Sequence, residues 1–253
     1  MGEIKFLGTG GARVVVTKQI RGSGGIWLSL NDSNILIDPG PGSLVKAISS
    51  RPKLDPSKLN AIILSHKHLD HSGDVNIMME AMTEGGLKKR GILLAPEDAL
   101  NNDPVVLKYV RDYVKDIVIL KEGERYYIDN IEVSTPKRLI HGAETYGLIF
   151  NYNNSSISYI SDTLYFPDIS TYYHADILII NVVRLKRDNL PIEHLNIDDA
   201  RNIIANIKPK MAILTHFGMN VIKEKPWEIA NNMERELNIK VIAANDGMSV
   251  KFD

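Results

Sequence analysis

The sequence contains no cysteine. This absence excludes disulfide bonds, cysteine nucleophiles and thiolate-based zinc sites together. Any metal must therefore be held by histidine nitrogen and carboxylate oxygen. There is also no run of about 18 apolar residues, so we expect no membrane span. The N-terminal segment Met1–Leu7 lacks the long apolar stretch of a signal peptide, and we expect a cytoplasmic protein.

An excess of either charge is missing too. The chain has 30 Lys and Arg against 31 Asp and Glu, for a formal net charge of −1. This balance argues against non-specific nucleic-acid binding through a basic whole-protein field. Two short basic clusters, residues 88–90 and 184–187, could contact RNA, but a solvated face is favoured. The sequence therefore does not exclude binding to nucleic acid, but it does not favour it.

The length of 253 residues fits one large domain, and we expect a single domain over residues 1–253. A chain of this size buries enough surface to fold without a disulfide or a structural metal. Any metal would thus serve chemistry. A homodimer is expected only because dimers are common among soluble proteins.

Short apolar runs alternate with helical patterns, which predicts a layered α/β architecture. Helices are expected over Ser43–Ser49, Val75–Met82, Val105–Val114, Asp199–Ile207 and Glu228–Leu237. Asn196 is a good N-cap for the fourth of these. Strands are expected at Ile4–Leu7, Ile26–Leu30, Ile35–Asp38, Ala61–Leu64, Ile92–Ala95, Val118–Leu120, Tyr126–Ile128, Ile131–Thr135, Leu148–Tyr152, Ile157–Ile160, Ile177–Asn181, Met211–Leu214, Val241–Ala243 and Ser249–Phe252.

Several of these strands end at a potential metal ligand. The strand Ala61–Leu64 precedes His66, and two later strands precede Asp162 and His216. A rigid scaffold of this kind can direct side chains from distant segments toward one site.

The strongest motif is His66-Lys67-His68-Leu69-Asp70-His71, which holds three of the seven histidines of the chain. His66 and His68 alternate in an extended segment, so both can point the same way. Asp70 and His71 follow in the turn before a helix that begins near Asp74. A polar loop with surface histidines is the plainer interpretation, but the density of ligands favours a metal site. Imidazole and carboxylate suit zinc, iron or manganese.

The chain resembles the metallo-β-lactamase superfamily, in its tRNase Z-like and cyclic-phosphodiesterase-like branch, over nearly its whole length. The resemblance implies a four-layer αβ/βα sandwich. It rests on the segments HKHLDH at His66–His71, Asp38-Pro39-Gly40, HGAETYGLIF from His141, YISDT around Asp162 and LTHF around His216.

The resemblance also implies two metal ions with a bridging hydroxide. The first ion would be bound by His66, His68 and His141, the second by Asp70, His71 and His216, with Asp162 bridging both. Such a hydroxide is nucleophilic near neutral pH. Two divalent cations against two carboxylates and one hydroxide leave a positive site, which favours a small anionic substrate.

Asp70 and His194 are the candidate catalytic residues. By resemblance, His194 would contact a phosphate or protonate the leaving oxygen; the plainer alternative is a histidine that binds backbone at a helix start. Asp38 would orient a metal-bound histidine such as His66 or His68. His174 matches no ligand position, and we expect it to be structural.

The loop region around residues 9–25 is glycine-rich, like the early loop of the resembled family. Its cations Arg13, Lys18 and Arg21 could hold phosphate oxygens, although such charges are more often solvated.

The substrate is narrowed by the spacing of twenty residues between His141 and Asp162, which a two-strand hairpin fills. The tRNA-binding arm that lies there in many tRNase Z proteins does not fit. A phosphodiesterase acting on a small phosphodiester or cyclic phosphate is therefore favoured. The alternatives are a thioester, lactone or lactam hydrolase on the same fold, a tRNA 3′-processing endonuclease without the arm, and a non-catalytic or redox member of the family.

Overall fold

The computed structural model describes residues 2–187 and 192–253. The chain divides into two compact units. Unit 1 comprises Met1–Thr9, Arg21–Lys121 and Asp246–Asp253, and unit 2 comprises Gly10–Ile20 and Glu122–Asn245. The N-terminal and C-terminal segments thus belong to the same unit.

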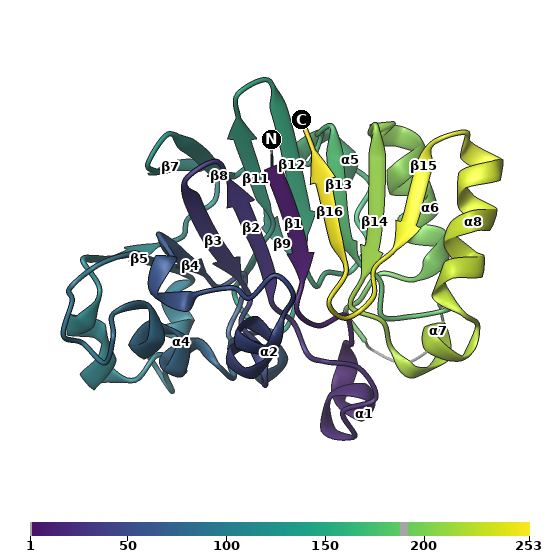
Figure 1. Cartoon of the computed structure of the whole chain (residues 1–253). Coiled ribbons are helices and arrows are strands. Elements are labelled where there is room, and N and C mark those ends of the chain that lie inside the picture. Colours follow the sequence, from purple (N-terminus) through teal and green to yellow (C-terminus); the bar gives the residue numbers. More distant parts are fainter. Residues whose placement is uncertain (1, 188–191) are drawn as a thin grey trace. The chain divides into compact units, whose positions relative to one another are not determined.

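Unit 1 is built on a seven-stranded sheet in the order β16-β1-β2-β3-β4-β5-β6 (Figure 1). The first four strands in this order pair antiparallel, and β3 to β6 pair parallel. The strands are β1 (Gly2–Phe6), β2 (Ile26–Leu30), β3 (Ser33–Ile37), β4 (Ala61–Ile63), β5 (Ile92–Ala95), β6 (Asp116–Ile119) and β16 (Ser249–Phe252).

The helices of unit 1 pack on one face of this sheet. In α4 (Val75–Met82) the buried residues are Val75, Met78, Met79 and Met82, which lie on one side of a helix with a 3.6-residue period. They share a core with sheet residues such as Leu36. The other helical segments are α2 (Ser43–Ser49), α3 (Leu69–Ser72) and the 3-10 turns η1 (Pro56–Lys58), η2 (Glu97–Ala99) and η3 (Lys108–Tyr113).

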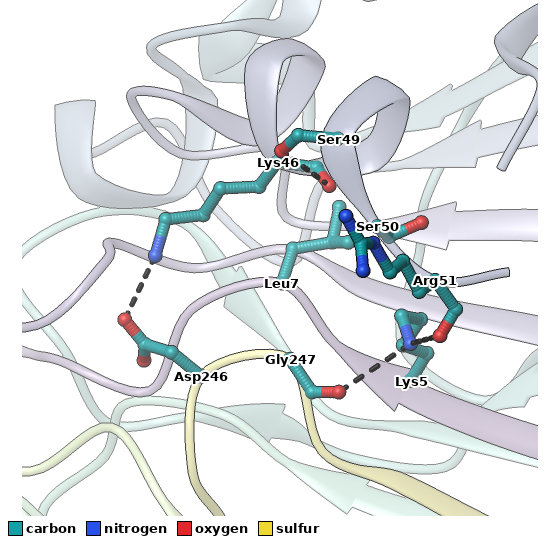
Figure 2. A pocket seen from close by; sticks show the side chains of 8 residues that line it. All are labelled: Lys5, Leu7, Lys46, Ser49, Ser50, Arg51, Asp246 and Gly247. Atoms are coloured by element: carbon teal, nitrogen blue, oxygen red, sulfur yellow. Dashed lines mark hydrogen bonds and ion pairs between the residues drawn. The ribbon is translucent and has the colours of Figure 1, made fainter. Parts of the chain in front are cut away.

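Lys5 fastens the C-terminal segment of unit 1 to its first strand. Its buried ammonium group donates to the carbonyl oxygens of Gly247 (3.4 Å) and Arg51 (3.5 Å) and to the Ser249 hydroxyl (3.2 Å). Figure 2 shows a pocket whose lining includes Lys5, Arg51, Gly247 and Lys46. The pocket contains none of the predicted site residues.

Asp246 also links the C-terminal segment of unit 1 to other segments of the unit. Its carboxylate accepts hydrogen bonds from the backbone N–H groups of Gly22 (2.6 Å) and Thr9 (2.9 Å) and forms an ion pair with Lys46 at 2.8 Å (Figure 2). Burial raises the pKa of Asp246, but the bonds from Lys46 and Gly22 outweigh this effect and leave the pKa below its ordinary value. The anionic form is therefore the one that unit 1 stabilises.

Unit 2 is built on a second seven-stranded sheet, in the order β15-β14-β13-β12-β11-β8-β7, with a small two-stranded sheet of β9 and β10 (Figure 1). Strands β12 to β15 pair parallel, and the remaining pairs are antiparallel. The strands are β7 (Glu124–Ile128), β8 (Ile131–Thr135), β9 (Arg138–Leu139), β10 (Thr145–Tyr146), β11 (Leu148–Tyr152), β12 (Ser155–Ile160), β13 (Ile177–Asn181), β14 (Met211–Thr215) and β15 (Lys240–Ala243).

The helix that follows His194 in unit 2 is capped by Asn196 as predicted, but it begins at Ile197, two residues before the predicted start. The Asn196 side chain accepts from the N–H groups of Asp198 (2.8 Å) and Asp199 (3.1 Å), and the Asp199 carboxylate accepts from the Asn196 N–H, which completes a capping box. The helices of unit 2 are α1 (Ala12–Thr17), α5 (Ile169–Tyr172), α6 (Ile197–Ile207), α7 (Met219–Lys223) and α8 (Pro226–Leu237), of which α8 runs along β15 (Figure 1).

Two local predictions were wrong. The expected helix Val105–Val114 is the 3-10 segment η3, where the Arg111 guanidinium binds the carbonyl oxygens of Val106 and Leu100. Its β-branched valines also disfavour a regular helix. The expected loop after Gly11 contains α1 instead, with Val15 buried.

Within the described residues, no helix is both long and apolar enough to cross a membrane. The single-domain prediction for residues 1–253 stays a prediction.

Candidate metal-binding residues in each unit

Unit 1 gathers the four candidate ligands of the sequence motif after the end of β4. His66 follows this strand closely, and His71 lies in α3, which begins at Leu69. His66 and His71 are buried, and their ring centroids are 4.0 Å apart. The His68 ring stands edge-on to the His66 ring at 4.8 Å. The short helix α3, which the sequence did not predict, turns Asp70 toward His71, with 3.9 Å between Asp70 Oδ2 and His71 Nε2.

Asp38 holds two of these histidines from the end of β3. Its Oδ1 accepts from the Ser65 N–H (2.6 Å), and its Oδ2 accepts from the Ser65 hydroxyl (2.7 Å) and lies 3.0 Å from His71 Nδ1. The Ser65 hydroxyl lies 3.0 Å from His66 Nδ1. Asp38 therefore orients His71 directly and His66 through Ser65. The expectation of an orienting role fits, but the histidine that it contacts is His71.

Backbone geometry around Asp38 is tight. Asp38 has a φ of +50°, which a non-glycine residue adopts only at some cost. Gly24 packs so closely that an added Cβ would lie 2.7 Å from the carbonyl oxygens of both Asp38 and Asp70. In unit 1 the glycine at position 24 thus allows the backbone to pass close to Asp38 and Asp70.

Unit 2 brings His141, Asp162, His194 and His216 together. Asp162 is buried, and its Oδ2 lies 3.3 Å from His216 Nε2 and 3.5 Å from His194 Nδ1. The His141 and His194 rings are 5.0 Å apart, and His141 Nδ1 lies 3.1 Å from the Glu193 carbonyl oxygen. His141, Asp162 and His194 each offer a ligand atom within 4.8 Å of the others.

Three neighbouring parallel strands of unit 2 end beside two members of this cluster, Asp162 and His216. Ile160 is in register with Ile180, and Asn181 with Thr215, so β12, β13 and β14 end at one edge of the sheet. Asp162 and His216 follow the first and third of these strands. The middle strand ends on Asn181, which the sequence interpretation missed because its residue type alone gave no signal.

The loop before α1 packs directly on His216. His216 has a φ of +59°, and the next residue, Phe217, accepts a backbone hydrogen bond from Gly11 at 3.0 Å. A Cβ on Gly11 would overlap the His216 imidazole ring. Glycine is thus required at position 11 if His216 is to keep its orientation.

The remaining candidates have ordinary surroundings. His174 is exposed and takes no part in the cluster of unit 2. Arg13 is exposed on α1, whereas Arg21 donates to the Thr9 hydroxyl at 2.9 Å. Burial lowers the pKa of Arg21, although the charge of nearby Asp246 acts in the opposite direction.

Of the two basic clusters, the second is partly structural. Arg184 is buried, pairs with Asn196 in a β-bridge and donates to the Ile192 carbonyl. In the first cluster, Lys88 forms an ion pair with Glu84 at 2.7 Å. The expected solvated face is wrong for Arg184, because its side chain is buried. The expectation that neither cluster binds RNA stays a prediction.

The donor chemistry in each unit fits a divalent metal. Unit 1 offers three imidazoles and a carboxylate, with Asp38 bonded to a ring nitrogen in the manner of residues that orient metal-bound histidines. Unit 2 offers a buried carboxylate among three imidazoles. Nitrogen and oxygen donors of this kind suit zinc, manganese and iron.

Comparison with known proteins identifies the family. The model of the beta-lactamase superfamily domain matches residues 33–217, and the chain belongs to this family of hydrolases. An uncharacterized protein of Methanocaldococcus jannaschii is 32% identical, over 99% of this chain and 95% of its own length. Ribonuclease Z of Borrelia duttonii is 22% identical, over 98% and 96% respectively.

The solved structures show the fold. The crystal structure of a diphosphatase from the PhnP family superposes with a TM-score of 0.74 at 22% identity, covering 100% of this chain and 98% of that one. The predicted resemblance and the α/β metallo-β-lactamase fold are therefore confirmed. The assignment of individual ligands stays a prediction.

Proposed function

We propose that this hydrolase is a dinuclear metal-dependent phosphodiesterase whose substrate is a small phosphodiester or cyclic phosphate. The ligands of unit 1 (His66, His68, Asp70 and His71) and of unit 2 (His141, Asp162 and His216) would jointly hold two divalent cations. This pairing rests on the family pattern carried by the sequence. Zinc is the first choice, with manganese or iron as alternatives. A bound pair of cations would supply a nucleophilic hydroxide near neutral pH and polarise the phosphoryl group.

The observation that carries the phosphodiesterase assignment is the place of His194. Its Nδ1 faces the Asp162 carboxylate at 3.5 Å, and its side chain is 16% exposed. The protonated imidazole would be the form that donates a proton to the substrate. Because Nδ1 is directed at Asp162, Nε2 is the nitrogen left to donate to the leaving oxygen of the substrate.

A bound metal pair would supply the hydroxide that replaces the leaving oxygen on phosphorus. His194 would give its proton to that leaving oxygen, so that an alcohol would depart and a phosphomonoester would remain. A thioester or lactone develops its charge on a carbonyl oxygen instead and has less need of an acid at this position. One of the similar structures is a diphosphatase from the PhnP family, which supports a substrate that contains a phosphoryl group.

A tRNA 3′-processing activity is the second candidate, favoured by the ribonuclease Z relative. That alignment runs over 312 positions against the 253 residues of this chain, so at least 59 of its positions have no counterpart here. In unit 2 the short strands β10, β11 and β12 occupy the segment between His141 and Asp162. A small substrate is therefore preferred over tRNA.

The experiment compares bis(p-nitrophenyl) phosphate, a cyclic nucleotide, a thioester, a lactone and a precursor tRNA under zinc, manganese and iron. We expect turnover of the first two. Turnover of the thioester or lactone, with no phosphodiester cleaved under any metal, would refute the proposal. Cleavage of precursor tRNA alone would favour the second candidate.

Two variants test the roles. His194→Ala should reduce kcat/KM for the phosphodiester by about 10²- to 10⁴-fold with unchanged metal content, and the exposed His174→Ala serves as its control. Asp162→Ala should lose metal and activity together. A His194→Ala enzyme with full activity would remove His194 from the mechanism. A cytoplasmic location and a homodimer remain predictions, which fractionation and light scattering would test.

A further inference from the structure

The buried amide of Asn181 lies against the carboxylate that is proposed to bridge the metals. Its Nδ2 is 2.9 Å from Asp162 Oδ1 and 3.2 Å from the Tyr159 hydroxyl oxygen. Asn181 and Asp162 are each only 3% exposed, and Tyr159 is 2% exposed. All three residues lie in unit 2, on β12, β13 and the turn after β12.

The chemistry of the contact fixes the orientation of the amide. An ionised carboxylate can only accept hydrogen bonds, so the NH₂ group of Asn181, and not its oxygen, must face Asp162. That group has two N–H donors, and the two contacts use one each. A charge-assisted bond from a rigid strand end is worth more than a neutral one, so this contact determines how the carboxylate is turned.

The two carboxylate oxygens of Asp162 therefore have different contacts. Oδ1 is held by Asn181, whereas Oδ2 faces His216 at 3.3 Å and His194 at 3.5 Å. Oδ2 is thus the oxygen presented to the other candidate ligands of unit 2. We infer that Asn181 is a positioning residue that fixes Asp162 for metal binding, an inference that rests on the proposed function.

An amide suits this role better than a cation would. A lysine or arginine in place of Asn181 would pair with Asp162 and weaken its attraction for a metal ion. The neutral amide orients the carboxylate and leaves its charge available. The strand register supports the same role, because β13 lies between the two strands that carry Asp162 and His216.

The experiment measures zinc binding to the metal-free protein by competition with a chromophoric chelator. Asn181→Ala should bind zinc about 10- to 100-fold more weakly than the wild type, as expected when a group that orients a ligand is lost. Tyr159→Phe is the matched control, since it removes the other partner of the amide and leaves the contact with Asp162. Its zinc affinity should stay within about threefold of wild type.

A spectrum separates positioning from general destabilisation. With cobalt in place of zinc, the visible d–d bands should change in Asn181→Ala and stay unchanged in Tyr159→Phe. The Tm of the metal-free protein should fall in both variants. If the alanine variant does not fold, Asn181→Ser, whose hydroxyl is too short to reach Asp162 in the same way, is measured by the same criteria.

Wild-type zinc affinity together with an unchanged cobalt spectrum in the Asn181 variants would overturn the inference and leave the proposed function standing. If the wild-type protein bound none of zinc, cobalt, manganese and iron, the proposed function itself would fail, and the inference with it. The two failures are thus distinguishable by the wild-type titration alone.

Discussion

Replacement of Asp38 by asparagine tests the proposed metal site through the network of unit 1. The Asp38 side chain is buried and accepts hydrogen bonds from the Ser65 N–H and the Ser65 hydroxyl. It also accepts from His71 Nδ1 when that nitrogen carries the proton, which is the tautomer that leaves Nε2 available to a metal. In the variant Asp38→Asn, the amide oxygen must take the Oδ1 place, since an NH₂ group there would face the Ser65 N–H at 2.6 Å. The NH₂ group then faces His71.

This orientation reverses the hydrogen bond to His71. An NH₂ group donates, so His71 Nδ1 becomes the acceptor and its proton moves to Nε2, the nitrogen that a metal would use. The loss of a hydrogen bond to a charged group costs about 1.5–3 kcal/mol. At about 1.4 kcal/mol per factor of ten, this corresponds to an affinity for zinc about 10- to 100-fold below that of the wild type.

Isothermal titration of the metal-free protein with zinc measures the effect directly. Asp74→Asn is the matched control, because Asp74 is a carboxylate of the same region that accepts only a backbone bond from Leu44 at 3.0 Å among the contacts described. It should bind zinc like the wild type. Equal zinc affinity of Asp38→Asn and wild type would show that Asp38 does not control the histidine, and would refute the reasoning.

Three further substitutions follow from single contacts. Gly11→Ala should push the His216 imidazole out of place, lower zinc affinity at least about 10-fold and cost about 1–3 kcal/mol of stability; an unchanged titration would contradict this. Asp246→Asn should destabilise the protein by about 1.5–3 kcal/mol at pH 7 in denaturant unfolding. Because the pKa of Asp246 is lowered in the folded protein, its contribution to stability is present above the unfolded-state pKa of about 3.9 and is lost as pH falls through the folded-state pKa. A difference in unfolding free energy between the variant and the wild type that persisted unchanged to pH 2 would be inconsistent with the ion pair. Asn196→Ala removes the N-cap of α6 and should cost about 1 kcal/mol, with Asn151→Ala on the exposed side of β11 as a near-neutral control; equal Tm values for the two would argue against the capping box.

Much of the fold could be predicted because its pattern is local. The stripe Val75, Met78, Met79 and Met82 identifies α4 by its period, and the buried strand Ile177–Asn181 is recognisable as a continuous apolar run. The helix α1 could not be found in this way. Its consecutive valines favour a strand, and only Val15 is buried.

The candidate site was predictable where residue type alone indicates chemistry. Histidines and aspartates in family motifs were found by their position in the sequence, and their surroundings in each unit fit a metal. The contact of Asp38 with His71 was not foreseen, because it depends on the four-residue helix α3. Asn181 was missed because an asparagine at a strand end indicates nothing until the register of β12 and β13 is known.

The two orienting residues differ in charge, and this bears on substrate choice. Asp38 adds a buried anion beside His71, whereas Asn181 adds none beside Asp162. When Asp38 is included, three carboxylates and a hydroxide balance two divalent cations, so the proposed site has no excess positive charge with which to select an anion. Selection for a phosphodiester must then depend on a placed donor, and His194 is the candidate. His194→Ala should therefore lose far more activity toward a cyclic nucleotide, whose leaving oxygen needs a proton, than toward any neutral lactone that the enzyme hydrolyses slowly. An equal decrease in kcat/KM for both substrates would show that His194 supports the structure of the site and does not select the substrate.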